Sequence, residues 1–377
     1  MVTRTEPAEP HAFHLEPVRS SASVERLWVE LAAERAGSFF TSWIWIGTWL
    51  SLLPDALRPR LLIATTEGRP SAAGIVVHRN QRRHLLVSSR RLHLHATGDP
   101  HFDCLTIEHN GFVGFEARTA AFWRSLLRWF ATGAADADEL VLPGIADGPP
   151  LEEAHRHGGL CTAARVPAYR LELARLSGSN GDLEGILSSN SRQQMRRTIR
   201  AVEKRGALRI DEASALAKAH GYFDGLKELH ARSWARRGKP HSFLNPFFET
   251  FHRALIERAF PAGAIQMLRI SAASRILGYL YNFRWNGCVY AYQSGFDDGD
   301  PELRPGYVCH KLAIEHSFRS GQHTYDFMAG RNRLKESLAT QTYAMNWLAV
   351  QQPLLRFRIE GVARRLKAAA RSRFAGV

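Results

Sequence analysis

The chain has little cysteine, with four residues in 377 and no C-x-x-C pair. Neither a zinc site of closely spaced cysteines nor a small scaffold held together by disulfides is therefore indicated. Histidines and acids gather between positions 93 and 109, but their spacing matches no standard metal site. We expect no bound metal.

The chain also lacks an apolar run long enough to cross a bilayer, which takes roughly 20 residues. The uncharged segment 38–54 contains Ser, Thr and Gly, ends at a proline, and places Trp45 and Trp49 one helical turn apart. This pattern predicts a buried helix. No apolar signal-peptide core occurs near the start, so we expect a cytoplasmic protein, with peripheral contact to the inner membrane left open.

Acidic residues are outnumbered, because 36 Asp and Glu stand against 50 Lys and Arg and give a formal net charge of +14. The excess is concentrated in segments 79–91, 192–205 and 356–373. A positive surface attracts anions, so nucleotide cofactors, carrier proteins, RNA and anionic lipid are eligible partners. Segment 192–205 has no interleaved aromatic residues for stacking on bases, and we expect no DNA binding.

The order of predicted elements repeats along the chain, and the length suggests two domains. A polar, turn-rich segment at 175–181 separates two halves, each with helices, a strand meander, and then helix, strand, helix, strand. We predict an α/β fold (an α+β mixed sheet) of two duplicated domains. One continuous sheet across this segment would count against the boundary. The predicted parts are a flexible tail (1–20), an N-terminal domain (21–174), a C-terminal domain with the candidate site (182–352) and a basic helix (353–377).

A predicted helix start is the first candidate site, formed by Arg304, Pro305, Gly306, Tyr307 and Val308. The free N–H groups and the positive dipole end of a helix N-terminus suit a pyrophosphate. A glycine there leaves out a Cβ that would obstruct the anion. Proline and glycine also begin helices for structural reasons alone, so that alternative stays open.

A second candidate site lies at the end of a predicted strand, where Asp326 faces away from Tyr325 and Phe327. Asp326 could orient an amine nucleophile or accept its proton. Lys335, on the next short helix, could neutralise an oxyanion or hold a phosphate. The structural alternatives are a turn cap for Asp326 and a solvated surface position for Lys335.

Two tyrosines on the preceding strand complete the candidate site. Tyr290, Tyr292 and Ser294 share one strand face and could line an acceptor pocket, although such tyrosines often simply pack. We predict that Tyr290 binds substrate and that Tyr292 takes part in catalysis. No G-x-S-x-G elbow and no cysteine in a nucleophile context occur. A transfer reaction would therefore proceed by direct attack between two bound substrates.

These elements in this order resemble the CelD/BcsL-type acetyltransferases, a GNAT-superfamily group associated with bacterial cellulose and other exopolysaccharide biosynthesis. The likeness spans roughly residues 15–350. It rests on positions 40–45 with Trp49, 167–171, 190–197 (NSRQQMRR), 229–238 (LHARSWARRG), Pro305-Gly306, and 325–330 (YDFMAG) with Lys335.

The resemblance implies two GNAT-like domains arranged as in Fem-type transferases, and an N-acyltransferase that uses acetyl-CoA or a longer acyl-CoA as co-substrate. It also implies that Gly306 and the following helix lie against the donor phosphates and that Lys335 lies near the transferred acyl group. Family members usually have an aromatic residue before the lysine and a tryptophan after it, where this chain has Leu334 and Leu338. The fuller glycine-rich loop of simple GNAT enzymes is absent.

The expected acceptor is a small-molecule or saccharide amine. Within the matching motifs, we predict that Trp234 and Arg197 contact the substrate. Two alternatives stay open. An acyl carrier protein or aminoacyl-tRNA could replace CoA as donor, or the protein could be a non-catalytic accessory factor of polysaccharide assembly on an anionic membrane surface.

Overall fold

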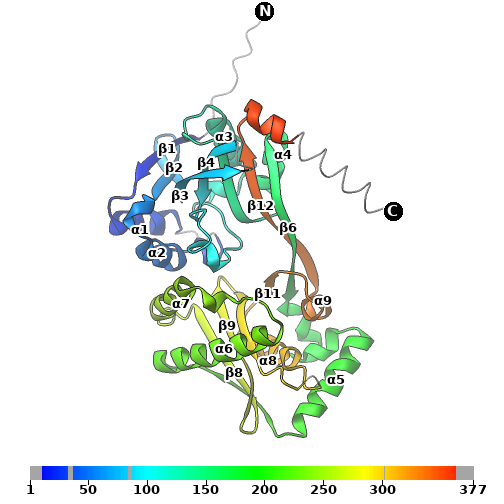
Figure 1. Cartoon of the computed structure of the whole chain (residues 1–377). Helices are drawn as coiled ribbons and strands as arrows, with labels where there is room; N and C mark the ends of the chain where they lie inside the picture. The colour runs from blue at the N-terminus through cyan, green and yellow to red at the C-terminus, as the bar shows by residue number, and fades with distance from the viewer. Residues whose placement is uncertain (1–10, 33–36, 84–86, 301, 362–377) are drawn as a thin grey trace, which may run out of the picture.

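The computed structural model describes residues 11–32, 37–83, 87–300 and 302–361. Two lobes share one twelve-stranded sheet (Figure 1). The strands are β1 (Ala12–Pro17), β2 (Arg60–Thr66), β3 (Arg69–Arg83), β4 (Val87–Leu94), β5 (Glu139–Ala146), β6 (Leu160–Glu172), β7 (Leu208–Glu212), β8 (Ile265–Ala272), β9 (Arg275–Trp285), β10 (Cys288–Phe296), β11 (Thr324–Ala329) and β12 (Gln341–Gln351). The helices are α1 (Ser21–Leu31), α2 (Trp43–Leu52), α3 (Ala120–Ala131), α4 (Pro149–His157), α5 (Ser189–Glu203), α6 (Leu216–Arg236), α7 (Pro246–Ala259), α8 (Pro305–Arg319) and α9 (Arg333–Leu338).

Each lobe repeats one arrangement of six strands. In the N-terminal lobe, β1 to β4 pair in antiparallel order, β5 is parallel to β4, and β12 is antiparallel to β5. In the C-terminal lobe, β7 to β10 pair in antiparallel order, β11 is parallel to β10, and β6 is antiparallel to β11. The predicted mixed α/β fold with duplicated domains is confirmed.

The sixth strand of each lobe is exchanged. β6 follows β5 in the chain but pairs with β11, whereas β12 follows β11 but pairs with β5, and the two pair with each other at the waist. The predicted place of the last strand, within a domain at 182–352, is therefore corrected. The sheet is continuous across 175–181, which counts against that boundary. Hydrophobic patterns identify a strand but not its partner, so the exchange left no local signal.

Part of the predicted tail is ordered. Residues 12–17 form β1, which pairs with β2, so the prediction of a flexible segment at 1–20 is wrong for this stretch. Phe13 and Leu15 alternate along β1 and pack against the core beneath α3. This short alternation is the signal that was overlooked. The short edge strand β7 was not predicted either, and residues 1–10 lie outside the described residues.

The tryptophan-rich segment forms α2 and is buried, as predicted, and the structure places it between the lobes. The ring centroid of Trp45 is 4.8 Å from that of Phe251, and Phe39 stacks on Phe283 at 4.3 Å. One hydrophobic core cluster therefore joins α1 and α2 to α6, α7 and β9. Among the residues that the structure describes, no helix is long and apolar enough to cross a membrane.

The chain after β12 packs on the N-terminal lobe. Residues 355–361 are helical, and the rest of the predicted basic helix lies outside the described residues. Phe357 is buried, and Arg356 forms an ion pair with Asp138 at 2.7 Å. Leu355 and Ile359, one helical turn apart, are 72% and 61% exposed.

Candidate active site

The sheet divides between β10 and β11. These strands pair only from Cys288, opposite Thr324, to Tyr290, opposite Asp326. A β-bulge follows in each strand directly after this point. Beyond it β10 continues along β9 and β11 continues along β6, so the two strands diverge and form a wedge. Bulges bend strands and occur often beside active sites.

A cavity of about 580 Å³ lies at the open end of this wedge, and the start of α8 lines it. Arg304 precedes the helix in the left-handed conformation, with φ of 36°, and Pro305 occupies the first turn. No acidic residue lies in that first turn, so the positive dipole end is available to an anion, whereas the Tyr307 N–H already donates to the Arg304 carbonyl at 3.0 Å. From α8 the lining includes Gly306 and Tyr307, and the remaining walls come from α6, β10 and α9 and include Trp234, Phe296 and Leu334.

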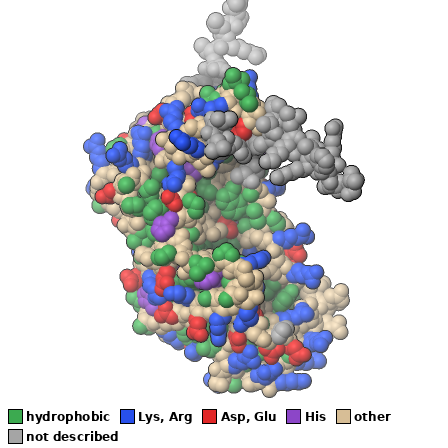
Figure 2. Space-filling model, viewed as in Figure 1, with side chains coloured by type: hydrophobic (Ala, Val, Ile, Leu, Met, Phe, Trp, Pro, Cys, Tyr) green, Lys and Arg blue, Asp and Glu red, His purple; other side chains and the backbone are tan. Residues whose placement is uncertain are grey.

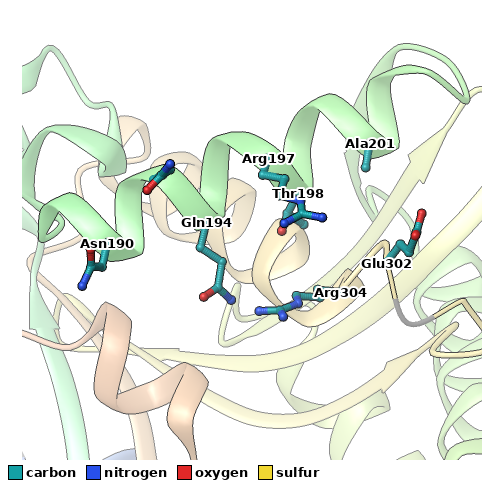
Figure 3. A pocket seen from close by; sticks show the side chains of 8 residues that line it. Asn190, Gln194, Arg197, Thr198, Ala201, Glu302 and Arg304 are labelled. Atoms are coloured by element: carbon teal, nitrogen blue, oxygen red, sulfur yellow. The ribbon is translucent and has the colours of Figure 1, made fainter.

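Two arginines extend this positive region. Arg304 also lines an adjoining cavity of about 620 Å³, together with Arg197, Gln194 and Asn190 of α5. Figure 3 shows Arg304 and Gln194 directed into the space between α5 and the start of α8, with Arg197 above them. Neither arginine has an ion-pair partner among the described residues. The structure thus brings together two predicted binding residues from different helices.

Gly306 and Val308 were expected beside the donor phosphates, but their neighbours in the structure are apolar side chains. A Cβ added to Gly306 would lie 3.2 Å from Leu334 and 3.4 Å from Phe296, so the glycine makes room for these side chains rather than for an anion. Val308 is fully buried in the core of the C-terminal lobe and does not line the cavity. The helix turns the side chain of Val308 inward, and only its backbone N–H belongs to the helix start.

Asp326 lies at the apex of the wedge and is almost completely buried. Its carboxylate accepts hydrogen bonds from the Tyr343 hydroxyl at 2.7 and 2.8 Å and from the Met328 N–H at 2.7 Å. Tyr325 and Phe327 point into the core of the C-terminal lobe, which confirms the predicted alternation. The hydrogen bond from the Met328 N–H fits the structural alternative, in which Asp326 caps the turn. The hydrogen bonds from Tyr343 of β12 are a further contact, which that alternative does not include.

The N-terminal lobe contributes two groups to this apex that sequence reasoning missed. His109 Nε2 lies 3.2 Å from Asp326 and 3.0 Å from the Tyr343 hydroxyl. Glu108 accepts a hydrogen bond from the Ala329 N–H at 2.8 Å. Burial raises the pKa of Glu108. His109 had been considered only as part of a metal cluster, and the described residues contain no such cluster.

Lys335 is not a solvated surface lysine. Its ammonium group donates to the carbonyls of Ala329 at 2.7 Å and Met328 at 3.3 Å, in the turn that ends β11. Burial lowers the pKa of Lys335, and the nearby carboxylates of Glu108 and Asp326 oppose that shift. Lys335 therefore lies close to Asp326, as the predicted site requires.

The two predicted tyrosines pack on the other side of the apex. Tyr290 is buried, with its ring 5.4 Å from that of His109. The Tyr292 hydroxyl donates to the Leu105 carbonyl and lies 3.2 Å from His252. Burial raises the pKa of both phenols well above the usual value, so both stay neutral. Tyr292 thus bridges the lobes, and its hydroxyl is occupied by a backbone partner.

Trp234, which we predicted to contact the substrate, lines the cavity beside His230, a residue that sequence reasoning missed. The rings of these two residues lie 5.5 Å apart. His230 Nδ1 is 3.0 Å from the Ser294 carbonyl and must donate to it, which leaves Nε2 as an acceptor. Nε2 is buried and has no partner among the described residues. Burial lowers the pKa of His230, which keeps it neutral.

Residues 189–336, which contain the wedge, the start of α8 and Lys335, match the family described as acetyltransferase (GNAT) domain. Over this segment, about two fifths of the chain, the C-terminal lobe is therefore similar to GNAT acetyltransferase domains. The match does not extend over the N-terminal lobe, which supplies His109 and Glu108 to the apex of the wedge. No curated protein sequence matches the chain.

Solved structures share the whole two-lobed fold. FemX covers 86% of this chain and 95% of its own at 8% identity, with a TM-score of 0.51. The C-terminal DUF2156 domain of a putative lysylphosphatidylglycerol synthetase from Agrobacterium fabrum covers 93% and 96% at 11% identity, with a TM-score of 0.53. A conserved protein of unknown function from Bacteroides thetaiotaomicron VPI-5482 covers 90% and 100% at 8% identity, with a TM-score of 0.54. At these identities the likeness extends to the fold alone.

Proposed function

We propose that the protein is an N-acyltransferase that moves an acyl group from an acyl-CoA thioester to an amine. One observation carries the proposal. The wedge between β10 and β11 opens at the start of α8, where an anion fits, and closes at Asp326 and His109, where a proton can be accepted. A donor that lies along the wedge would therefore have its phosphates at one end and its reactive thioester at the other.

The donor phosphates would lie at the α8 N-terminus with Arg304, and Arg197 would add a second cation. The amide-containing arm of CoA would follow β10 beyond Tyr290, where that edge of the strand has lost β11 as a partner. Free strand edges bind extended amide chains through backbone hydrogen bonds. This scheme accommodates an acetyl group or a longer acyl group, and acetyl-CoA is the donor we propose first.

In the reaction, the amine nitrogen attacks the thioester carbonyl, the new C–N bond forms, and the C–S bond breaks to release CoA. Lys335 has three N–H donors, and two of them bind the carbonyls of Ala329 and Met328, which leaves one for the developing oxyanion. The side chain of His109 is 18% exposed, against 3% for Asp326. His109 is therefore the better proton acceptor, and Asp326 is its positioning residue.

The protonation of His109 follows from its neighbours. Because Tyr343 donates to Asp326, His109 Nε2 must carry the hydrogen that faces this pair. Nδ1 then holds the lone pair that can accept a proton from the amine. The same logic, in which a carboxylate selects the tautomer of a histidine base, operates in hydrolase triads.

We propose that the protein acylates a small-molecule or saccharide amine. As the resemblance to CelD/BcsL-type enzymes implies, this reaction would belong to exopolysaccharide biosynthesis, or to other cell-envelope or secondary-metabolite biosynthesis. A cytoplasmic location, with contact at the inner membrane, is part of this proposal. The donor could also be delivered by an acyl carrier protein, whose acidic surface would suit the positive charge of the chain.

A second candidate donor is aminoacyl-tRNA, and the basic face of α5 favours it. A shallow cavity of about 750 Å³ runs along this helix and is lined by Arg192, Arg196, Arg197, Arg200 and Lys204. Arg197, Arg200 and Lys204 have no ion-pair partner among the described residues. Such unpaired cations can neutralise the phosphates of RNA, and the resulting affinity would fall steeply with salt.

A non-catalytic role at a membrane surface is the third candidate. The exposed Leu355 and Ile359 lie one turn apart, directly before the basic stretch 362–373. Apolar side chains beside cations favour an anionic bilayer surface. Flotation of the full chain with phosphatidylglycerol vesicles tests this role, and equal binding by a chain that ends at residue 353 would contradict it.

The donor is tested by thermal shift with acetyl-CoA, longer acyl-CoAs and charged tRNA, followed by assay of CoA release with a panel of amines. We expect acyl-CoA to raise the melting temperature and Arg304→Ala to weaken this binding about tenfold. Arg209 is exposed on β7 and lines none of the cavities at α5 and α8, so Arg209→Ala is the matched charge control. Stabilisation by charged tRNA alone would replace CoA with the second candidate donor.

A further inference from the structure

Another cavity, of about 320 Å³, lies against the N-terminal lobe and shares no lining residue with the cavities at α5 and α8. Its walls are mainly apolar and include three tryptophans, Trp45 and Trp49 from α2 and Trp347 from β12. In the space-filling view, hydrophobic side chains gather around the hollow between the lobes (Figure 2). The volume is within the range of small-molecule sites, which typically combine apolar walls with few polar groups.

One polar group of this cavity has no partner. His95 lines the cavity, is 4% exposed, and its Nε2 atom is buried without a hydrogen bond among the described residues. The neighbouring indole of Trp28 cannot supply one, because its N–H donates to the Thr41 carbonyl at 2.8 Å. Buried polar groups are nearly always hydrogen-bonded, so an orphan at a cavity wall points to a ligand.

The surrounding bonds determine what His95 offers. The Asn110 amide nitrogen donates to the carbonyls of Leu94 and Pro143, at 3.2 and 2.9 Å. Its oxygen accepts from the Gly111 N–H at 2.8 Å, and it lies 2.7 Å from His95 Nδ1. His95 must therefore donate through Nδ1, which leaves Nε2 with a lone pair. The cavity presents an acceptor to an O–H or N–H group.

The cavity has no free charge for an ionic ligand. Burial lowers the pKa of His93 and His95 to about 4, so both are neutral near pH 7. The Asp103 carboxylate already accepts from the Thr97 N–H, the Thr97 hydroxyl and the Gly98 N–H, at 2.7 to 2.9 Å. A neutral, apolar group with one hydrogen-bond donor is the chemistry that matches these walls.

Two elements connect this cavity to the apex of the wedge. The segment 102–107 lines the cavity and continues directly into Glu108 and His109. On β12, Tyr343 contacts Asp326, and Trp347, four residues later in the same strand, lines the cavity. Four residues of strand span about 13 Å. One molecule of that length could place an amine at His109 and an apolar end in the cavity.

We propose that this cavity holds the apolar, ring-sized end of the amine acceptor, which donates an O–H or N–H to His95 Nε2. The proposal rests on the acyltransferase function proposed above and narrows the acceptor to amines with such a group. The three tryptophans supply flat, rigid surfaces that suit an aromatic or alicyclic ring. His95 then selects ligands by hydrogen bonding, and it takes no part in the proton transfer.

Indole and indene test the cavity directly, because the two molecules share one shape and only indole carries an N–H. We expect isothermal titration of the full chain to show tighter binding of indole, by about fivefold to tenfold, as one hydrogen bond would give. His95→Leu should remove this difference. Because that variant could lose its fold, Val141→Phe provides a second test by filling the cavity, and it should weaken both probes. Arg304→Ala, in the other lobe, should leave both affinities unchanged.

Equal binding of indole and indene to the native chain would overturn the role of His95, and no binding of either would overturn the site. In the transfer assay, indole should raise the KM for an acceptor amine and leave the KM for acyl-CoA unchanged. Binding without such competition would separate the cavity from the acceptor. An absence of acyl transfer would overturn the proposed function, yet the binding comparison would still be interpretable, so the two failures are distinguishable.

Discussion

The contacts of Asp326 suit a residue that positions its neighbours rather than the proton acceptor that the sequence suggested. Three donors surround its buried carboxylate, namely the Tyr343 hydroxyl, the Met328 N–H and His109 Nε2. A carboxylate bonded in this way is better suited to hold its neighbours than to accept a proton from a substrate. The sequence indicated Asp326 because strand alternation is a local property. His109 lies more than two hundred positions earlier, and no local pattern connects the two.

We expect His109→Gln to lower kcat by about 10²-fold, because removal of a general base typically costs 10²–10⁴ in rate. The glutamine retains an N–H donor for Asp326 but has no titratable nitrogen. The variant should therefore lose kcat while the KM for acyl-CoA and the melting temperature stay unchanged, whereas a merely structural loss would lower the melting temperature as well. Ser38 donates to the carbonyl of His109, so Ser38→Ala is a neighbouring control that leaves the ring in place.

Lys335 provides a second test at the residue scale. Lys335→Met keeps the apolar stem and removes the ammonium, and we expect kcat to fall by about 10²-fold, as for loss of one oxyanion donor. Lys335→Arg, which retains the charge, should recover part of the rate if charge is the cause. The melting temperatures and the KM for acyl-CoA are measured in parallel. Wild-type rates in both variants would remove Lys335 from the site.

Most helices and strands could be predicted from the sequence. Where the structure differs from the prediction, the difference has a local cause. The helices that became α5, α6, α7 and α8 and the strands that became β8 to β11 follow clear hydrophobic periodicity bounded by polar turns. β1 was missed because it is short and follows an acidic, proline-rich start. The wedge itself could not be predicted, because it arises where two strands change partners, and a partner is not encoded in the pattern of either strand.

The start of α8 leads to a prediction about packing between elements. A Cβ at Gly306 would meet Leu334 of α9 and Phe296 of β10, at 3.2 and 3.4 Å. Gly306→Val should therefore push these side chains into the donor cavity that they line and raise the KM for acyl-CoA by about tenfold. Leu334→Ala alone is the control, and Gly306→Val combined with Leu334→Ala should recover most of the donor affinity. No recovery in the double variant would favour direct obstruction of the donor phosphate.

At the scale of the whole molecule, strand exchange and the core between the lobes make the two halves interdependent. β6 and β12 each complete the opposite lobe, and Trp45 and Phe39 pack on Phe251 and Phe283 across the boundary. The duplication was visible in the order of elements, whereas the exchange depends on pairing between residues as far apart as Arg170 and Asp326, or Leu142 and Leu348. The same arrangement places His109 of one lobe on Asp326 of the other, so the candidate site exists only when both lobes are assembled.

A chain divided at the predicted boundary should therefore fail to fold as separate halves. In residues 182–377 alone, β11 would lack β6, and β12 would have neither β5 nor β6 beside it. We expect this fragment to be unfolded or aggregated, and to regain structure when it is produced together with residues 1–181. As a control, a protease site inserted into the polar loop at 175–181 of the intact chain should be cut without separating the pieces, because the exchanged strands hold them. Circular dichroism and size-exclusion chromatography measure both outcomes. A monomeric, cooperatively melting 182–377 would show that the lobes are independent and that the exchange contributes little to stability.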